Sequence, residues 1–308
     1  MRHLFFWAVL GLTAVASPFS RAAEKSVEDG DKKPIKALLV LGGCCHDYAN
    51  QQNILADGIA ARANVQVTVA YDPSDKTNHL NPVYKNPDWA KGFDVVIHDE
   101  CSADVKDPEI INRILKPHRE GLPSVVLHCG MHSYRSEGFP NQDTPWFQFT
   151  GLPTTGHGPH EPLTITFTET ESPITQGLQG WTTGKEELYN NVRPLLAGAQ
   201  ALAKGKQGNQ EAVVAWTHAY GDKKAKVFGT TLGHSSETVA DPRYLDLVTR
   251  GLLWSIGKLD DQHLKPVKAT AQSEPAAAGL NAAAQVVAAE PAKAEDCECE
   301  TTVAAQAK

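Results

Sequence analysis

The feature that most constrains this chain is a short apolar run over residues 122–127, L-P-S-V-V-L, which ends abruptly in His128, Cys129 and Gly130. An apolar run of this length, with two adjacent valines, is typical of a buried strand of a parallel sheet. A strand that ends in reactive side chains and a glycine resembles a nucleophile elbow, a tight strand-to-helix turn that holds one side chain at the carboxyl edge of the sheet. The sequence therefore predicts a turn with His128 on its apex and Cys129 beside it.

Other strand and helix patterns alternate along the chain around this element. Residues 35–41 are almost all aliphatic and lead through Gly42 and Gly43 into a helical pattern over residues 50–63. Further strands are predicted at residues 65–71, 93–98, 163–167, 211–218 and 226–231, the last two as a hairpin, and further helices at residues 108–116 and 242–256. Strands that alternate with helices and end in glycine or polar residues predict an α/β fold with a doubly wound, mostly parallel sheet.

The two ends of the chain differ in character from its middle. Residues 1–22 have a short positive start, an apolar run over residues 4–16 and small residues before the expected cleavage after Ala22, so they predict a signal peptide and an exported protein, periplasmic or secreted. The apolar run is too short for a transmembrane helix; an uncut N-terminal anchor is the alternative. Residues 23–33 are a charged linker, and residues 261–308 are an Ala-, Pro- and Glu-rich tail predicted to be disordered. One domain is therefore expected over residues 34–260.

Charge and cysteine content narrow the classes of partner. The formal net charge is −7, and no cluster of lysine and arginine with interleaved aromatic residues occurs, so a nucleic acid is not an expected partner and a neutral small molecule is. Six cysteines are present, at positions 44, 45, 101, 129, 297 and 299, with spacings that do not suggest a disulfide framework. An isolated bridge from Cys44 or Cys45 to Cys129 is expected if those loops meet. Otherwise Cys44 and Cys45 are small buried hydrophobic residues.

Histidines and one acid recur at predicted strand ends and loop mouths: His46, His98 beside Asp99, His128, His157, His234 and Glu187. Because ligands of open α/β sheets bind beyond the carboxyl ends of the strands, His46, His98 and His128 would face one crevice. Imidazoles there can act as acid, base or metal ligand near neutral pH. For His98 we favour a buried structural role, and for His132 and His160 a position in surface loops. The segment with Trp146, Phe147 and Phe149 is interpreted as a packed lid.

Several motifs together resemble those of one family. These are L-L-V-L-G-G-C-C-H from Leu38, L-H-C-G from Leu127, T-G-H from Thr155, E-E-L-Y from Glu186, and the long stretch from Ala212 to His234. In this order they cover residues 36–257 and resemble the ThuA-like, or trehalose-utilisation, family of the class I glutamine amidotransferase-like superfamily.

The resemblance implies a flavodoxin-like sheet and a pocket built by His46, His128, His157, Glu187 and His234, which are the candidate catalytic residues. It also suggests substrate contacts from a second group: Gly43, Asp47, Cys129, Tyr189 and Trp216. In the amidotransferases the elbow residue is a nucleophilic cysteine, whereas His128 stands here, so glutaminase chemistry is set aside. Cys129 is one position away, and its side chain is expected to point away from the mouth of the site.

These observations predict an exported enzyme that acts on a small carbohydrate, an oxidised sugar or glycoside, by acid/base chemistry at a histidine cluster. Isomerisation, elimination and hydrolysis are all compatible with it, although ordinary glycoside hydrolysis lacks a second carboxylate beside Glu187. A divalent metal such as zinc is an expected cofactor candidate, with His46, His128, His157 and His234 as ligands. Two alternatives stay open: a non-catalytic carbohydrate- or metal-binding module, and a hydrolase that uses Cys129.

Overall fold

The computed structural model describes Met1, residues 33–260 and residues 262–265 of the 308-residue chain. Most of the predicted signal peptide, charged linker and tail therefore lies outside the described residues, as do Cys297 and Cys299. From Pro34 onward the described residues form one compact unit. Within the described residues no helix is long and apolar enough to cross a membrane.

All nine strands of the described residues join one sheet, in the order β2-β1-β3-β4-β9-β8-β7-β5-β6. The strands are β1 (Ile35–Gly43), β2 (Val65–Asp72), β3 (Val95–Cys101), β4 (Ser124–Leu127), β5 (His157–Phe167), β6 (Trp181–Tyr189), β7 (Ala199–Gln207), β8 (Gln210–Tyr220) and β9 (Ala225–Thr230). The α-helices are α1 (Tyr48–Arg62), α2 (Pro108–Arg119), α3 (Pro145–Thr150), α4 (Ser236–Ala240) and α5 (Pro242–Ser255), and the 3-10 helices are η1 (Pro82–Lys85) and η2 (His128–His132).

The sheet is mixed, with one parallel and one antiparallel half. Strands β2, β1, β3, β4 and β9 pair in parallel, in the spatial order of an open doubly wound sheet. From β9 outward, β8, β7, β5 and β6 pair antiparallel. The predicted α/β class is confirmed, whereas the expected mostly parallel sheet describes only the first half. The strands over residues 181–189 and 199–207 are absent from the sequence-based prediction because their apolar residues are spaced by polar and glycine residues.

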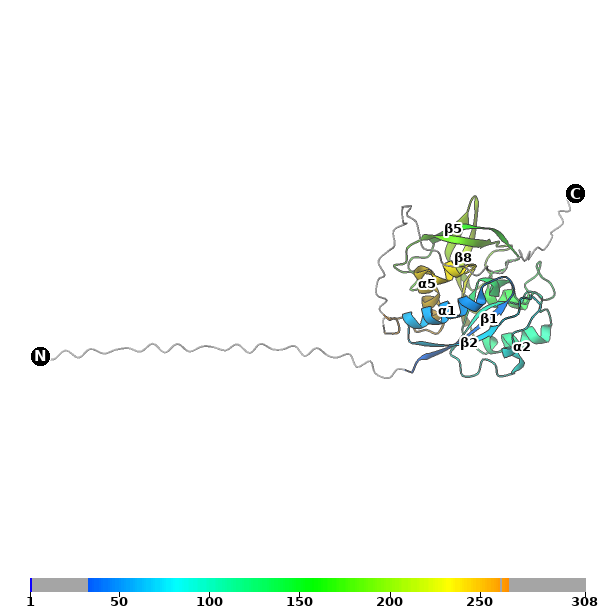
Figure 1. Ribbon diagram of the computed structural model, residues 1–308, viewed down its shortest axis with the longest axis horizontal. Helices are drawn as coiled ribbons and strands as arrows, with labels where there is room; N and C mark the ends of the chain where they lie inside the picture. Colours follow the sequence, from blue (N-terminus) through cyan, green and yellow to red (C-terminus); the bar gives the residue numbers. More distant parts are fainter. Residues whose placement is uncertain (2–32, 261, 266–308) are drawn as a thin grey trace, which may run out of the picture. The chain divides into compact units, whose positions relative to one another are not determined.

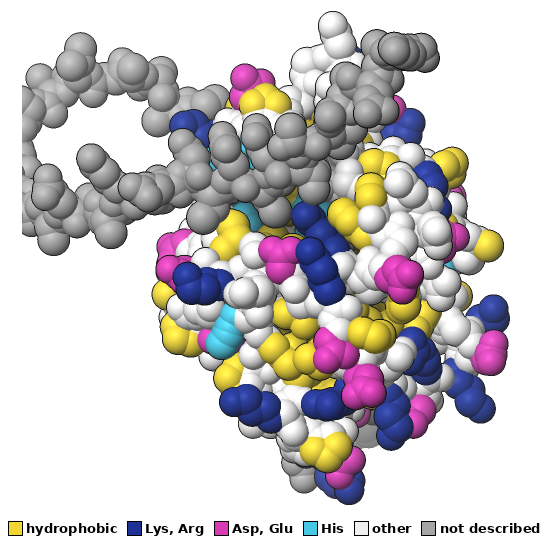
Figure 2. Space-filling model, turned by 90° about the vertical axis from the view of Figure 1, so that its right-hand side faces the viewer, with side chains coloured by type: hydrophobic (Ala, Val, Ile, Leu, Met, Phe, Trp, Pro, Cys, Tyr) yellow, Lys and Arg dark blue, Asp and Glu magenta, His cyan; other side chains and the backbone are white. Residues whose placement is uncertain are grey.

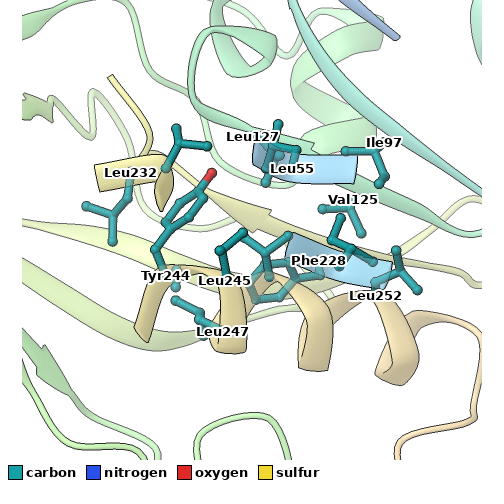
Figure 3. Close-up of a cluster of buried hydrophobic side chains, with 14 of the residues drawn as sticks. Leu55, Ile97, Val125, Leu127, Phe228, Leu232, Tyr244, Leu245, Leu247 and Leu252 are labelled. Atoms are coloured by element: carbon teal, nitrogen blue, oxygen red, sulfur yellow. The ribbon is translucent and has the colours of Figure 1, made fainter. Parts of the chain in front are cut away.

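Helices cover both faces of the parallel half (Figure 1). Alternate residues of β1 point to opposite faces: Leu39 and Leu41 belong to one hydrophobic cluster, and Leu38 and Val40 to another. The first cluster packs beneath α1 and α5, where Figure 3 shows leucines of both helices against the side chains of β3, β4 and β9. The second cluster packs beneath α2 and α3. A strand buried on both faces needs the continuous apolar sequence of β1 and β4.

Short contacts extend the ordered domain beyond its predicted boundary at residue 260. Leu264 forms an isolated antiparallel bridge with Ala63, directly after α1. The backbone N–H of Lys265 donates to the Arg62 carbonyl at 2.7 Å, and its Nζ donates to the Ala60 carbonyl.

On the face shown in Figure 2, positively and negatively charged side chains are interspersed.

Candidate active site

His128 stands directly after β4, in the predicted turn. Its backbone has a φ of 37°, in the left-handed region, as expected for a tight turn between β4 and η2. Its Nδ1–H donates to the Thr231 carbonyl at 2.7 Å, which aims Nε2 in the opposite direction. His128 is 1% exposed. The ring of Tyr189, on β6, packs against its imidazole, with 4.9 Å between the two ring centroids. The His128 ring is therefore hidden from solvent, because Tyr189 in the antiparallel half of the sheet packs over the strand end.

Glu187 of β6 lies at the centre of a histidine cluster. Its Oε2 lies 3.3 Å from Nε2 of His128, and its Oε1 lies 3.0 Å from Nδ1 of His234. The same Oε1 lies 2.8 Å from Nε2 of His160 and 3.6 Å from Nε2 of His157. The side chain of Glu187 is only 6% exposed, so one buried negative charge lies beside four imidazole rings.

The charges of this cluster are coupled. Burial opposes the ionised form of Glu187, but the imidazoles of His128 and His234 outweigh it and hold its pKa well below the usual range. Burial also opposes the charge on His128, yet contact with Glu187 raises the pKa of His128 to about 9. Burial, followed by the nearby charge of His128, lowers the pKa of His46 well below its usual value. A neutral His46 therefore sits beside an ion pair of His128 and Glu187.

His46, His128 and His234 form a convergent set of possible metal ligands. One ligand nitrogen of each lies within 4.8 Å of the others. Three buried nitrogens in this set have no hydrogen-bond partner: Nδ1 of His46, Nε2 of His128 and Nδ1 of His234. The last two lie at ion-pair distance from the oxygens of Glu187. Buried polar atoms without partners are rare and costly, and a cation among them would satisfy all three.

Two buried side chains hold the loop that carries His234. Oε1 of Glu186 accepts hydrogen bonds from the backbone N–H groups of Gly233 and His234, at 3.0 and 2.9 Å. Nε2 of Gln51, on α1, donates to the His234 carbonyl at 3.2 Å. Such outer contacts fix the orientation of a metal ligand. Neither residue was among the predicted site residues. The signal for Glu186 is an acid at a position where β6 is otherwise buried.

His157 and His160 reach Glu187 from the neighbouring strand β5. In the β5–β6 ladder His157 is opposite Tyr189, and His160 is opposite Glu187. His160 is exposed, as expected, but it lies in a strand and not in a loop, because β5 begins at His157 and brings both rings to the cluster. His132, also assigned to a surface loop, is 4% exposed and stacks on Tyr189 at 4.1 Å between ring centroids.

The five residues predicted to contact the substrate lie in different parts of the fold. Tyr189 packs between His128 and His132, and Asp47 is exposed at the start of α1, where its Oδ2 accepts from Ser236. Cys129 is 6% exposed in the first hydrophobic cluster. Trp216 does not reach the site, since it is fully buried in the second cluster and its indole N–H donates to the Thr150 carbonyl. Gly43 has a φ of 95°, and a Cβ there would meet the Cys101 carbonyl oxygen at 2.2 Å.

His98 lies within β3 rather than beyond its end, and it faces away from the histidine cluster. Its Nδ1 lies 2.9 Å from Oε1 of Glu100, and its Nε2 lies 3.1 Å from Nε2 of His118. The hydroxyls of Tyr84 and Tyr134 donate to the same Glu100 oxygen. His98 is fully buried in this network, in agreement with the favoured structural role and against a shared crevice with His46 and His128.

The cysteines at the strand ends adopt a pairing different from the expected one. Cys44 and Cys45 form a disulfide with each other, and Cys101 and Cys129 are buried and take no part in a disulfide. A bridge from Cys44 or Cys45 to Cys129 is therefore absent. The neighbour of Cys44 is instead Cys101, on the adjacent strand β3, with 3.6 Å between the sulfur atoms.

The family model for ThuA, trehalose utilisation, matches residues 36–255. This match spans well over half of the chain. The chain belongs to the ThuA family. The resemblance found in the sequence motifs is thereby confirmed, and the family indicates a role related to carbohydrates. No curated protein matches this ThuA chain.

Two solved structures share the fold of this ThuA chain. A ThuA-like protein from Parabacteroides merdae aligns with a TM-score of 0.55 at 17% identity, over 77% of this chain and 94% of the other. A ThuA-like protein from Bacteroides uniformis aligns with a TM-score of 0.51 at 14% identity, over 72% of this chain and 93% of the other. At such identities the similarity establishes the fold and not the reaction.

Proposed function

We propose that this ThuA protein is an exported enzyme that acts on an oxidised sugar or glycoside at the cluster around Glu187, with a divalent cation such as Zn²⁺ held by His46, His128 and His234. One observation carries the proposal: each of the three rings brings one ligand nitrogen within 4.8 Å of the others, and each has a buried nitrogen without a hydrogen-bond partner. Imidazole is a preferred ligand of zinc and related cations, and a three-histidine set leaves a position for substrate.

A cavity that meets the cluster only at His157 supports a carbohydrate as substrate; Leu188 in its wall points to the opposite face of β6 from Glu187. The cavity measures about 570 Å³, and His157 is part of its wall. Asn209 and Gln210 also line it and offer amide groups, whereas the amides of Asn190 and Gln207 in the same wall are bonded to the protein itself. Amides both donate and accept hydrogen bonds, as the hydroxyl groups of a sugar do, and a few such groups give a pocket its specificity.

In this proposal the cation would stabilise negative charge on the substrate, and Glu187 would transfer the proton. A bound cation would polarise the carbonyl of an oxidised sugar and make the neighbouring C–H more acidic. Glu187 stays ionised because of the imidazoles around it, so Oε2 can accept a proton from that carbon; the same imidazoles make it a weak base, so a bound cation would have to supply the acidity of the C–H. Return of that proton to a different atom or face of the sugar is an isomerisation, whereas its removal with departure of the group on the adjacent carbon, which takes up the proton, is an elimination. Both need one carboxylate rather than the opposed pair of an ordinary glycosidase.

The test combines cation binding with turnover of keto-sugars. We expect the chelated protein to regain thermal stability with Zn²⁺ or Mn²⁺, and to convert keto-disaccharides, including a keto derivative of trehalose, as followed by NMR. His128→Asn should abolish turnover and weaken the stabilisation by the cation while the fold persists, because asparagine tolerates the positive φ of this position. His79→Asn, which changes a histidine paired with Asp72 on the far side of β1, is the matched control. Unchanged cation binding in His128→Asn would disprove the assignment.

The alternative of a binding module without catalysis is separated by the same experiment. A binding module would show cation- and sugar-dependent stabilisation without any product. The third reading, a Cys129-dependent hydrolase, is disfavoured by the place of Cys129 in the hydrophobic cluster, away from bulk solvent.

A further inference from the structure

His157, His160 and Glu187 form a second group of possible metal ligands, distinct in composition from His46, His128 and His234. Their three ligand atoms also lie within 4.8 Å of one another. The two groups differ in exposure: the side chains of His157 and His160 are 27% and 48% exposed, whereas that of His128 is 2% exposed. The second group therefore lies at the solvent side of Glu187, next to the cavity that includes His157.

An irregularity in β5 brings these two histidines to one face. The four residues of β5 from His157 to His160 lie opposite only three residues of β6, from Tyr189 to Glu187. In a regular strand residues three apart point to opposite faces, and one extra residue restores them to the same face. Without this bulge only one of the two rings could meet the carboxylate of Glu187.

A third strand holds the bulge in place. Nε2 of Gln207, on β7, donates to the carbonyls of Pro159 and Glu161 at 3.0 and 3.2 Å. Pro159 has no N–H to lose from the ladder, which suits an irregular position. Nδ1 of His157 donates to the Gly158 carbonyl at 2.8 Å and so leaves Nε2, the nitrogen facing Glu187, with its lone pair.

The hydrogen-bonding capacity of Glu187 is too small for the nitrogens around it. Three imidazole nitrogens, from His157, His160 and His234, lie within 3.6 Å of Oε1. One carboxylate oxygen offers two lone pairs, so it accepts at most two hydrogen bonds, and the lone pair on Nε2 of His157 is left facing a negatively charged oxygen. A cation that takes the lone pairs of His157 and His160 together with Oε1 resolves this excess.

We propose that His157, His160 and Oε1 of Glu187 bind a second divalent cation, adjacent to the one held by His46, His128 and His234. This inference rests on the proposed function and extends it to a two-cation site. Oε2 of Glu187, which faces His128, remains available for proton transfer. Two adjacent cations favour a substrate with two neighbouring oxygens, such as the ketone and adjacent hydroxyl of an oxidised sugar.

The test is the stoichiometry and magnetic coupling of bound Mn²⁺ in the full chain after removal of metal with a chelator. We expect the wild type to bind two equivalents and to show a spin-coupled EPR spectrum. The double variant His157→Gln/His160→Gln should bind one equivalent and show the uncoupled six-line spectrum of a single ion. Both rings are partly exposed, so the fold should persist, with an unchanged circular dichroism spectrum. His263→Gln, at a histidine bonded to Asp260 outside both groups, is the control and should bind two.

The variant His234→Gln separates the two sites. One equivalent in the wild type, kept in His157→Gln/His160→Gln and lost in His234→Gln, would overturn the second site and leave the proposed function standing. One equivalent lost in the double variant and kept in His234→Gln would support the site at His157 and His160 and overturn the inner site. A wild type that binds no Mn²⁺ and no Zn²⁺ would overturn both.

Discussion

The buried carboxylate of Glu186 accepts a 2.9 Å hydrogen bond from the backbone N–H of His234. Glu186 is fully buried, and the same oxygen accepts from Gly233, so the loop after β9 is anchored to β6. The adjacent residue on β6, Glu187, contacts the His234 ring. Two consecutive acids therefore hold the backbone and the side chain of one histidine.

Glu186→Ala should weaken the binding of Zn²⁺ by about 10- to 100-fold, as is typical when a group that orients a metal ligand is lost. Glu186→Gln keeps an acceptor oxygen and should restore most of the affinity. Isothermal titration of the two variants against the wild type measures this. Equal affinities in Glu186→Ala and the wild type would show that the anchor does not position His234.

Stability at mildly acidic pH should depend on His118. Burial, followed by the charge of His98, lowers the pKa of His118 to about 3. In the unfolded chain His118 has a pKa near 6.5 and takes up a proton that it does not bind in the folded protein. Stability therefore falls as the pH drops from about 6.5 toward 3. Between pH 7.5 and 5 this amounts to about 2 kcal/mol.

The measurement is the free energy of unfolding of the wild type and of His118→Gln across that pH range. His118→Gln should be less stable at neutral pH but should show a shallower loss toward pH 5. Parallel curves for the two proteins would contradict the assignment.

The affinity for Zn²⁺ should rise with pH. The contact with Glu187 holds the pKa of His128 at about 9 against the opposing effect of burial, so in the absence of metal a proton must leave His128 before it can ligate. We expect about a tenfold gain in affinity per pH unit between pH 6 and 8, with release of a proton on binding. Titrations in buffers of different ionisation enthalpy detect that proton. In Glu187→Gln the dependence should be weaker, and a steep dependence retained there would assign the proton to another group.

Gly43→Ala should destabilise the fold by more than about 2 kcal/mol, because the added Cβ meets the backbone of β3 in a left-handed conformation. Gly92→Ala is the matched control: its φ is also positive, at 88°, but no atom lies within 4 Å of the added Cβ. It should cost only about 1–2 kcal/mol, the cost of the conformation itself. Chemical denaturation of both variants compares the two. Equal losses would mean that β1 and β3 separate to accept the methyl group.

Peptide mapping without reduction should find Cys44 and Cys45 linked within one peptide. Cys101 and Cys129 should react with iodoacetamide only after unfolding, because both are buried. The sulfur of Cys101 lies 3.6 Å from that of Cys44, so a Cys44–Cys101 link is the competing outcome. Its detection as the main species would overturn the vicinal pairing.

The sequence alone determined the parallel half of the sheet and the identity of most of the cluster. Continuous apolar runs that end in glycine or polar residues require strands buried on both faces, and their carboxyl ends then meet at one edge. This reasoning predicted the turn at His128 and brought His46 to the same edge. The T-G-H, E-E-L-Y and L-G-H motifs added His157, Glu187 and His234 through the resemblance to the ThuA family.

Only the tertiary structure decided how the antiparallel half covers that edge. Strand register and bulges depend on pairing between distant segments, so neither the place of His160 opposite Glu187 nor the anchor from Glu186 to His234 is visible in local sequence. The same holds for burial. His128 is hidden because β6 packs Tyr189 over it, whereas Trp216 is withdrawn from the site into the core. Which polar atoms lack partners, and hence where a cation would bind, follows from these long-range contacts.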